Sequence, residues 1–353
     1  MNVLVAMSGG VDSSVAAARL RDAGHHVVGV TMKLWGGESD TGCCSVSDVD
    51  DARRVARALG IEHHVFNFGD RFTEQVVGPY VDAHARGDTP NPCVECNRHL
   101  KFDKLLQRAR ALGFDAIATG HHARITKGGD GSLRVRRGID QHKDQSYVLY
   151  MLGQQQLRAT MLPVGEMTKA DVRAVARDLC LPTAAKPDSQ DVCFITSTRG
   201  RRRFLGDRLA FTPGVVVDRD GHEVARVDAV ELVTVGQRKG IGLRGGDVAP
   251  RYVTGVDVAR ATITVGDERD LLDATTVLRD LVWANESIDG TVLVQCSAHG
   301  AALPAVFDRD TSTLVWDEPH RRVAPGQAVV LYAGDEVLGG GIAVMPDRAR
   351  APR

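Results

Sequence analysis

The sequence predicts an α/β fold, in which a doubly wound parallel sheet is followed by a small central domain and a C-terminal β barrel. Two observations predict it. Segments typical of strands and helices alternate through the first 120 residues, as in successive βαβ units. From about Thr212 the chain changes to short Val- and Gly-rich strands separated by Gly and Asp turns. We expect three domains, covering residues 1–211, 212–273 and 274–353.

The elements of the first domain follow from hydrophobic periodicity and capping residues. Val3–Ala6 and His26–Met32 are apolar runs that predict the first two strands, and Asp12 or Ser13 can cap a helix that continues to Ala23. Thr168 is a plausible N-cap for a later helix, in a small helical region that leads out of the sheet. We expect the remaining helices at 47–59, 72–86, 97–112 and 168–180, and further strands at 65–67 and 116–119.

The second half predicts β structure throughout. Its apolar runs are short and lie between turn residues, which is typical of small barrels and sandwiches. The expected strands are 214–217, 253–258, 261–265, 291–294, 328–331 and 340–344.

Composition excludes disordered and fibrous proteins. The 353 residues include 43% hydrophobic residues, and 44 Lys and Arg balance 45 Asp and Glu. A net charge near zero does not indicate what kind of partner the protein binds. RNA binding must therefore be judged from local clusters of basic residues such as Arg199–Arg203. No apolar run reaches the roughly 18 residues of a membrane span and the start has no basic leader, so we expect a cytoplasmic protein without membrane contact. Seven Cys residues in a long chain favour reduced thiols over a disulfide framework.

The strongest motif is Ser8-Gly9-Gly10-Val11-Asp12-Ser13-Ser14, between the first strand and the first helix. Two glycines permit a tight turn whose N–H groups, with serine hydroxyls and the positive helix end, form a site for phosphate oxygens. The lysine of the Walker A pattern is missing, which disfavours γ-phosphate transfer. The loop resembles that of the PP-loop ATP pyrophosphatases, a resemblance that implies cleavage of ATP between its α and β phosphates and transfer of AMP to an acceptor.

Two cysteine blocks carry further chemistry. In Thr89-Pro90-Asn91-Pro92-Cys93-Val94-Glu95-Cys96, we expect Cys96 just before a helix, where the positive helix end lowers a thiol pKa. A zinc half-site or two unreactive buried thiols are alternative interpretations. The second block, Lys186-Pro187-Asp188-Ser189-Gln190-Asp191-Val192-Cys193, contains a thiol that by itself is typical of a packed core.

Together these blocks resemble the tRNA-specific 2-thiouridylase family. The resemblance extends through Lys143-Asp144-Gln145-Ser146-Tyr147, Gly236-Gln237-Arg238-Lys239-Gly240 and Gly326-Gln327-Ala328, and so covers nearly the whole chain. It implies a sulfurtransferase that adenylates the wobble uridine of tRNA at the carbon 2 oxygen and replaces that oxygen with sulfur, giving 2-thiouridine, AMP and pyrophosphate.

Site residues are carried over by position. The resemblance implies Cys96 and Cys193 as catalytic residues, and no permanent protein-bound metal site. ATP would be bound by Ala6, Met7, Ser8, Gly9, Gly10, Val11, Asp12, Ser13, Met32 and Gly120. The tRNA would be bound by Asn91, Pro92, Cys93, His121, Lys143, Asp144, Gln145 and Gln327.

The implied mechanism uses ATP with Mg²⁺ and a Cys193 persulfide loaded by a donor protein. Cys96 would attack that persulfide and leave a Cys96–Cys193 disulfide. Aspartate is found in some family members where this chain has Cys93, which leaves three roles open for Cys93: a base, a cluster ligand or neither. As cluster ligands, Cys93, Cys96 and Cys193 would hold three irons of a [4Fe–4S] cluster.

Two other interpretations remain open. A PP-loop ligase that adenylates a small metabolite would not need these three cysteines. A non-catalytic RNA-binding protein would use the β domains and Arg199–Arg203, although an arginine run is as often only a solvated surface. We expect the chain to act as a monomer.

Overall fold

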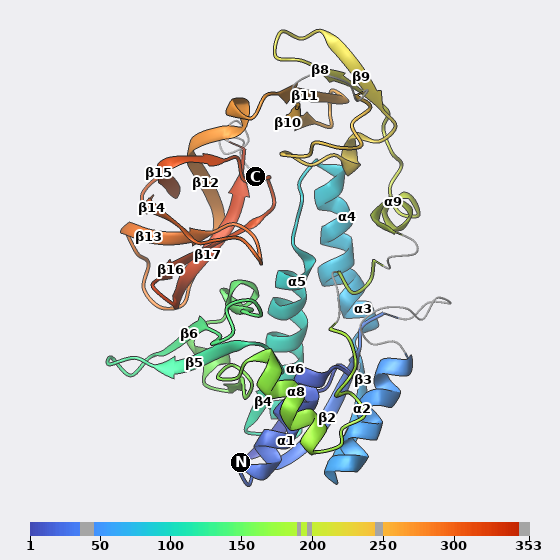
Figure 1. Cartoon of the computed structure of the whole chain (residues 1–353), viewed down its shortest axis with the longest axis vertical. Coiled ribbons are helices and arrows are strands. Elements are labelled where there is room, and N and C mark those ends of the chain that lie inside the picture. Colours follow the sequence, from blue (N-terminus) through green and yellow to red (C-terminus); the bar gives the residue numbers. More distant parts are fainter. Residues whose placement is uncertain (36–45, 189–191, 196–199, 244–249, 346–353) are drawn as a thin grey trace.

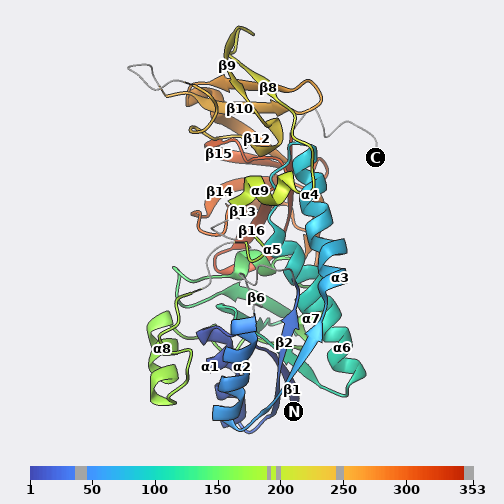
Figure 2. The same ribbon diagram turned by 90° about the vertical axis from the view of Figure 1, so that its right-hand side faces the viewer.

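The computed structural model describes residues 1–35, 46–188, 192–195, 200–243 and 250–345. The molecule is elongated (Figure 1). The N-terminal sheet and its helices form one end, the central β domain forms the other, and the barrel lies alongside the helices that connect them (Figure 2). The predicted fold class is confirmed.

The N-terminal sheet has the strand order β3-β2-β1-β4-β7, with all neighbouring strands parallel. Because each parallel connection must cross over the sheet, the carboxyl ends of these strands meet at one edge, where such folds bind ligands. The strands are β1 (Asn2–Ala6), β2 (His26–Lys33), β3 (Glu62–Asn67), β4 (Ala116–Ala118) and the short β7 (Thr160–Met161).

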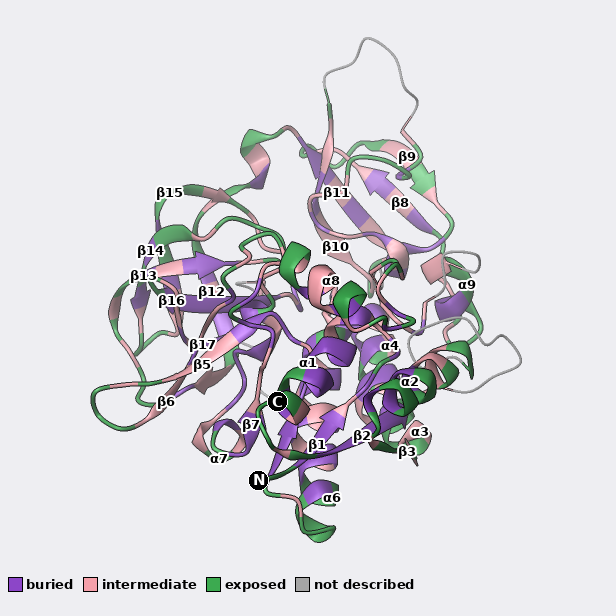
Figure 3. Ribbon diagram, turned by 60° about the horizontal axis from the view of Figure 1, so that its bottom comes forward, coloured by how far each residue is buried: buried purple, intermediate pink, exposed green. Residues whose placement is uncertain are grey.

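Helices cover both faces of this sheet, as its alternating side chains require. Val3 and Val5 of β1 pack with α1 (Val11–Asp22), α2 (Val46–Leu59) and α8 (Lys169–Asp178). Leu4 points to the opposite face and packs with the helices that follow β3 and precede β4. Figure 3 shows β1 as a buried strand between these layers, whereas α2 and α6 have exposed outer sides.

The helices on that second face run in two long segments. The first contains α3 (Gly69–Phe72), a π-helical turn (Thr73–Val77) and α4 (Gly78–Ala85). The second contains α5 (Pro92–Glu95), a π-helical stretch (Cys96–Lys104) and α6 (Leu105–Ala111). The second segment therefore begins about one turn earlier than predicted, because Asn91 is its N-cap and Pro92 occupies the first helical position.

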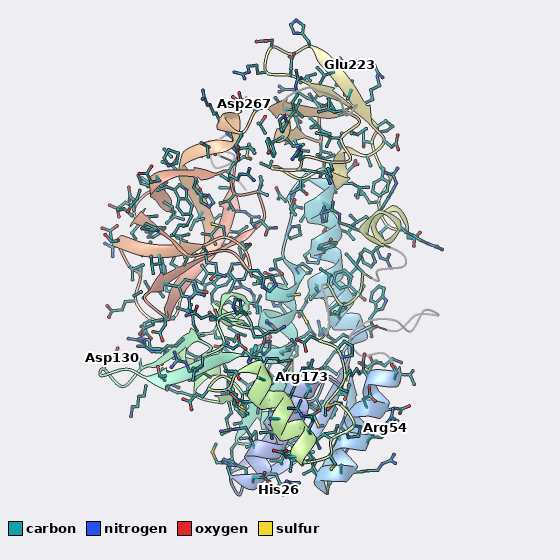
Figure 4. All side chains as sticks on the ribbon, viewed as in Figure 1. His26, Arg54, Asp130, Arg173, Glu223 and Asp267 are labelled. Carbon is teal, nitrogen blue, oxygen red and sulfur yellow. The ribbon has the colours of Figure 1, made fainter. Side chains whose placement is uncertain are left out.

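A hairpin that was not predicted leaves the first domain. Its strands β5 (Ala123–Lys127) and β6 (Leu133–Arg137) pair with each other, and β6 also pairs with strand β17 of the barrel. Figure 4 marks Asp130 at the tip of this hairpin. After it come a 3₁₀ turn (Ser146–Leu149) and α7 (Gln154–Leu157).

The central domain is a four-stranded sheet of order β10-β11-β8-β9. Its strands bury a small apolar core that includes Val216, Val253 and Ile263. Its elements are α9 (Gly200–Gly206), which leads in, β8 (Gly214–Val217), β9 (Glu223–Val227), a 3₁₀ turn (Val230–Leu232), β10 (Tyr252–Asp257) and β11 (Thr262–Gly266).

The C-terminal domain is a closed barrel of strands β12 to β17. Neighbouring strands are antiparallel, and β12 pairs with both β15 and β17, which closes the barrel and removes free sheet edges. After a 3₁₀ turn (Arg269–Leu271) the strands are β12 (Leu272–Trp283), β13 (Gly290–Gln295), β14 (Leu303–Asp308), β15 (Thr313–Arg321), β16 (Ala328–Ala333) and β17 (Glu336–Val344).

Within the described residues, no helix is both long enough and apolar enough to cross a membrane.

Candidate nucleotide and thiol site

The Gly-rich loop joins the carboxyl end of β1 to the first turn of α1. Gly9 has a φ of +74°, and a Cβ built on it would lie 2.4 Å from the backbone oxygen of Asp48 in α2. Gly10 has ordinary extended backbone, and a Cβ there would meet only the Ser8 hydroxyl, at 3.4 Å. Glycine is therefore required by geometry at Gly9 but not at Gly10.

Apart from Asp12, the other loop residues are either buried apolar side chains that pack in the core or serines that form hydrogen bonds within the turn. Met7 and Val11 are buried, and the Met7 N–H donates to Val30 of β2. The Ser13 hydroxyl donates to the Gly10 carbonyl at 3.1 Å and accepts from the Ser8 N–H at 3.2 Å. Ser13 thus holds the turn in shape, while the exposed side chain of Ser8 faces outward.

Gly120 and Met32 lie at the same edge of the sheet. A Cβ on Gly120 would lie 2.5 Å from the Ser13 nitrogen, so the chain after β4 packs directly on the start of α1. Met32 lies near the end of β2, is 7% exposed and packs in the core below the edge. A cavity beside the ends of β2 and β3 is lined by Lys33, Trp35 and Asn67. The structure thus brings the predicted ATP residues of three strands together.

Asp12 is the charged centre of the loop. Both of its carboxylate oxygens accept from Lys169 Nζ at 2.7 Å, and His122 Nε2 lies 3.0 Å from Oδ1. Burial acts to raise the pKa of Asp12, but the hydrogen bonds with His122 and Lys169 and the lysine charge lower it overall. Asp12 is therefore an ionised carboxylate with its charge balanced by Lys169.

Lys169 also contacts a second carboxylate, that of Asp188. Its Nζ lies 2.8 Å from Oδ1 of Asp188, and Asp188 also pairs with Lys143 at 2.7 Å and with Arg173 at 2.8 Å. Burial acts to raise the Asp188 pKa, but the hydrogen bonds from the two lysines lower it to about 2. Figure 4 shows Arg173 on α8, the helix that begins at Lys169 and packs against α1.

Cys93 and Cys96 lie in the first two turns of one helical segment. The Asn91 carboxamide accepts from the Cys93 N–H at 3.0 Å, so Cys93 is the cysteine at the positive helix end. Cys96 is one turn farther along, 8% exposed and packed in the core. The expectation that Cys96 lies just before a helix is wrong, because the helix begins at Pro92 rather than near Asn97.

Cys193 packs on the same hydrophobic cluster as Cys96 but is only partly buried. Next to it, Phe194 lies among Trp35, Tyr80 and Phe204, with ring centroids 5.0–6.4 Å apart. The phenylalanine anchors this stretch, and the thiol is therefore neither fully exposed nor enclosed in the core.

The segment 143–145 makes mostly internal contacts. The Asp144 carboxylate, with a side chain 5% exposed, accepts from Arg137 and from the Ser146 hydroxyl. Gln145 Oε1 accepts from the His122 N–H. Of the three predicted tRNA contacts in this segment, Gln145 is exposed, and the Lys143 side chain is 41% exposed although it is paired with Asp188, whereas the Asp144 side chain is buried.

Two other predicted tRNA residues also have protein partners. His121 is 7% exposed, with Nδ1 2.7 Å from the Thr119 hydroxyl. Burial lowers the pKa of His121 well below its ordinary value, so the ring is neutral. Gln327, on the barrel, donates to the carbonyl of Thr89 and so connects the barrel to the loop that precedes Asn91 and Pro92.

Several arginines in and beside the predicted RNA-binding run Arg199–Arg203 make contacts within the protein. Arg199 lies outside the described residues. Arg201 donates to the Leu232 carbonyl at 2.8 Å, and Arg208 lies over the Phe204 ring. Arg202, with a side chain 61% exposed, makes a surface ion pair with Asp228.

Three residues of this site were missed by the sequence analysis: His122, Lys169 and Asp188. Asp188 belongs to the block in which only Cys193 was weighed. Lys169 directly follows Thr168, whose capping box with Asp171 fixes the start of α8. A lysine at the first position of a helix, where cations are unfavourable, was the available signal.

Comparison with protein families finds matches over nearly the whole chain. Residues 1–197 match the family described as tRNA methyl transferase HUP domain. Residues 202–267 match the tRNA methyl transferase PRC-barrel domain, and residues 274–343 match the aminomethyltransferase beta-barrel domain.

Individual relatives are similar over their full length. A tRNA-specific 2-thiouridylase of Chloroflexus aurantiacus is 46% identical, over 99% of both chains. One from Mycolicibacterium gilvum is 48% identical, over 96% of this chain and 98% of the relative. Among solved structures, a 4-thiouridine synthetase–RNA complex with bound ATP is 16% identical over 55% of this chain and 44% of that one, with a TM-score of 0.37.

Proposed function

This chain belongs to the tRNA-specific 2-thiouridylase family, and from that premise we propose how its residues convert a tRNA uridine to 2-thiouridine with ATP and a cysteine persulfide. The observation that carries the proposal is the arrangement of the Gly-rich loop and the thiols on one domain. The loop lies at the carboxyl edge of the sheet, and Cys96 and Cys193 pack on one hydrophobic cluster of the same domain.

In the first step the loop binds the phosphates of ATP through Ser8–Ser13. The oxygen on carbon 2 of the wobble uridine attacks the α phosphorus, the bond to the β phosphate oxygen breaks, and pyrophosphate leaves. The backbone N–H groups at the start of α1 stabilise the negative charge that develops on the departing pyrophosphate. Asn91 and Pro92, at the helix start next to Cys93, position the base.

In the second step the terminal sulfur of a Cys193 persulfide bonds to carbon 2, and AMP leaves with the former carbonyl oxygen. The Cys96 thiolate then attacks Sγ of Cys193, which breaks the persulfide S–S bond and leaves its electron pair on the sulfur retained by the uridine. The two cysteines end as a disulfide, so a thiol reductant must restore them before the next turnover.

Two inorganic groups fit this site. Mg²⁺ would neutralise the phosphates of ATP and would reach the site bound to the nucleotide, because both oxygens of Asp12, the loop carboxylate, already accept from Lys169. A [4Fe–4S] cluster would be held by Cys93 and Cys96, one helical turn apart, and by Cys193, which packs on the same cluster of side chains as Cys96. Such a cluster would occupy Cys96 and Cys193 and would supply sulfide in place of the persulfide, whereas an exposed Cys93 without a cluster would act as a base or take no part.

The partners follow from this chemistry. The tRNA is contacted at Lys143, Gln145 and Gln327, with His121 and Asp144 shaping the surface beneath it. A persulfide-bearing donor protein loads Cys193. We propose a cytoplasmic monomer, since the tRNA substrate is found there and all of the site residues come from one chain.

The test combines anaerobically purified protein, unmodified tRNA, ATP, Mg²⁺ and a sulfur source. Mass spectrometry detects 2-thiouridine, and pyrophosphate release is measured in parallel. We expect Cys193→Ser and Cys96→Ser to abolish 2-thiouridine, while Cys180→Ser, which changes an exposed thiol just after the end of α8, leaves it unchanged. Pyrophosphate release without 2-thiouridine, unaffected by Cys193→Ser, would contradict the proposal and favour a small-metabolite ligase.

Cys93 is tested separately. Iron and sulfide are added to the anaerobic protein, and absorbance near 400 nm and iron content are measured. If Cys93 is a cluster ligand, Cys93→Ser loses the absorbance and the iron. If it is a base, Cys93→Asp retains 2-thiouridine formation while Cys93→Ala does not, and iron is absent from both.

A further inference from the structure

A cluster of five charged side chains connects the Gly-rich loop to the block that contains Cys193. Lys169 contacts Asp12 on one side and Asp188 on the other, with all three Nζ–O distances at 2.7–2.8 Å. Asp188 receives two more cations, Lys143 and Arg173. One carboxylate therefore contacts three positive groups, of which only Lys169 also pairs with Asp12 among the described residues.

Three cations around one anion are the arrangement that binds a phosphate group. The Gly-rich loop lacks the lysine that other phosphate loops carry, and Lys169 supplies an ammonium to the same place from a different helix. Its side chain is 12% exposed, and it is held against the first turn of α1 by Asp12. An ammonium fixed beside the N-terminal end of α1 adds to the positive potential of the loop N–H groups.

We propose that Lys169 binds the polyphosphate of ATP, and that Asp188 is an internal competitor which occupies the phosphate position of the Lys169, Lys143 and Arg173 cluster. This inference rests on the proposed use of ATP. Phosphate oxygens displace the Asp188 carboxylate from Lys169, whereas Asp12 stays paired with it. Asp188 thereby reduces the affinity for any polyphosphate, and Lys169 increases it.

The proposal predicts effects of opposite sign from two variants that break the same ion pair. Lys169→Gln removes the phosphate ligand, so the Kd for a nonhydrolysable triphosphate analogue of ATP should rise about tenfold or more, the loss of one charged hydrogen bond. Asp188→Asn removes the competitor, so the same Kd should fall by roughly threefold to tenfold. If the cluster had only a structural role, both variants would weaken binding.

Binding is measured by isothermal titration calorimetry on the full-length protein with Mg²⁺. Arg54→Gln is the control, because Arg54 is an exposed cation of the same domain whose ion-pair partner is Asp51 of α2 rather than Asp12 or Asp188. It should leave the Kd unchanged. Adenosine, which has no phosphates, should bind all of the variants equally, and this distinguishes a phosphate contact from general damage to the site.

Two results would overturn the inference: unchanged triphosphate binding by Lys169→Gln, or binding by Asp188→Asn that is no tighter than that of the unaltered protein. Thermal unfolding without nucleotide identifies a variant that fails to fold. In that case Lys169→Arg keeps the charge, and its Kd must lie between those of the unaltered protein and Lys169→Gln. If the unaltered protein binds no ATP analogue, the proposed function itself fails, and this outcome is distinct from both of the others.

Discussion

Two adjacent glycines in the phosphate loop have different physical requirements. Gly9 combines a left-handed backbone with a Cβ position only 2.4 Å from the Asp48 carbonyl oxygen, whereas Gly10 has neither constraint. Because the contact at Gly9 is with backbone, a side chain there cannot be accommodated by a change of rotamer.

Gly9→Ala should therefore destabilise the protein by about 2 kcal/mol, which corresponds to a fall of roughly 4–8 °C in the thermal unfolding midpoint of a domain of this size. It should also weaken binding of the ATP analogue, since α2 must move away from the loop. Gly10→Ala is the matched control and should shift the midpoint by under about 2 °C. Equal effects of the two substitutions would show that the loop backbone differs from the one described.

At the scale of single elements, α4 contains a buried histidine that links the first domain to the central domain. His84 is 2% exposed, its Nδ1 lies 3.3 Å from the Glu231 carbonyl oxygen, and its ring lies edge-on to Tyr80. Burial, with a smaller effect from the Arg201 charge, lowers the pKa of His84 to about 4.

This histidine makes stability depend on pH. Its pKa is lower in the folded than in the unfolded protein, where it is about 6.5, so the folded state binds fewer protons. The contribution of the neutral His84 to the free energy of unfolding is fully present above about pH 6.5 and is lost progressively as the pH falls toward 4. At pH 5 the loss is on the order of 2 kcal/mol.

We therefore expect the fall in the unfolding midpoint between pH 7 and pH 5 to be smaller for His84→Gln than for the unaltered protein. The fall should not vanish, because burial also lowers the pKa of His63 to about 4. His222→Gln, which alters a histidine whose side chain is 77% exposed, is the control. A pH dependence that is identical in His84→Gln and the unaltered protein would refute this role.

At the scale of the whole molecule, the barrel is joined to the first domain by a shared sheet and a cluster of ion pairs. Glu336 of β17 accepts from Arg134 at 2.8 Å and from Arg136 at 2.7 Å, and its side chain is 19% exposed. Asp335 pairs with Arg136 and Arg124 of the same hairpin. The Tyr147 hydroxyl donates to the Ala328 carbonyl at 2.7 Å across the same interface.

Glu336→Ala should lower the stability of the interface by about 1–3 kcal/mol, because two partly buried guanidinium groups each lose one of their two carboxylate partners. Calorimetry should show the unfolding transition shifted down, and hydrogen exchange should be faster in β6 and β17. Glu268→Ala removes an ion pair whose two side chains are more than half exposed, and it should cost under about 1 kcal/mol. If the two variants are equally stable, the ion pairs do not hold the domains together.

The sequence by itself determined the fold class, the position of the Gly-rich loop and the family, because these depend on local features. Alternating apolar segments predict the parallel sheet. A Gly-Gly turn between a strand and a helix indicates a tight loop at the carboxyl end of the strand, and this holds however the domain packs on its neighbours. The helix that begins at Pro92 starts about one turn earlier than the sequence predicts, since a proline can start a helix as well as break one.

Only the tertiary structure decided which residues meet. The β5–β6 hairpin was missed because its strands are stabilised by pairing with the barrel, about 200 residues later in the chain. The packing of α8 on α1 brings Lys169 to Asp12, and Lys169 in turn contacts Asp188, which lies ten residues after the end of α8. Ion pairs and buried contacts of this kind depend on distances between elements, which no local pattern of residues contains.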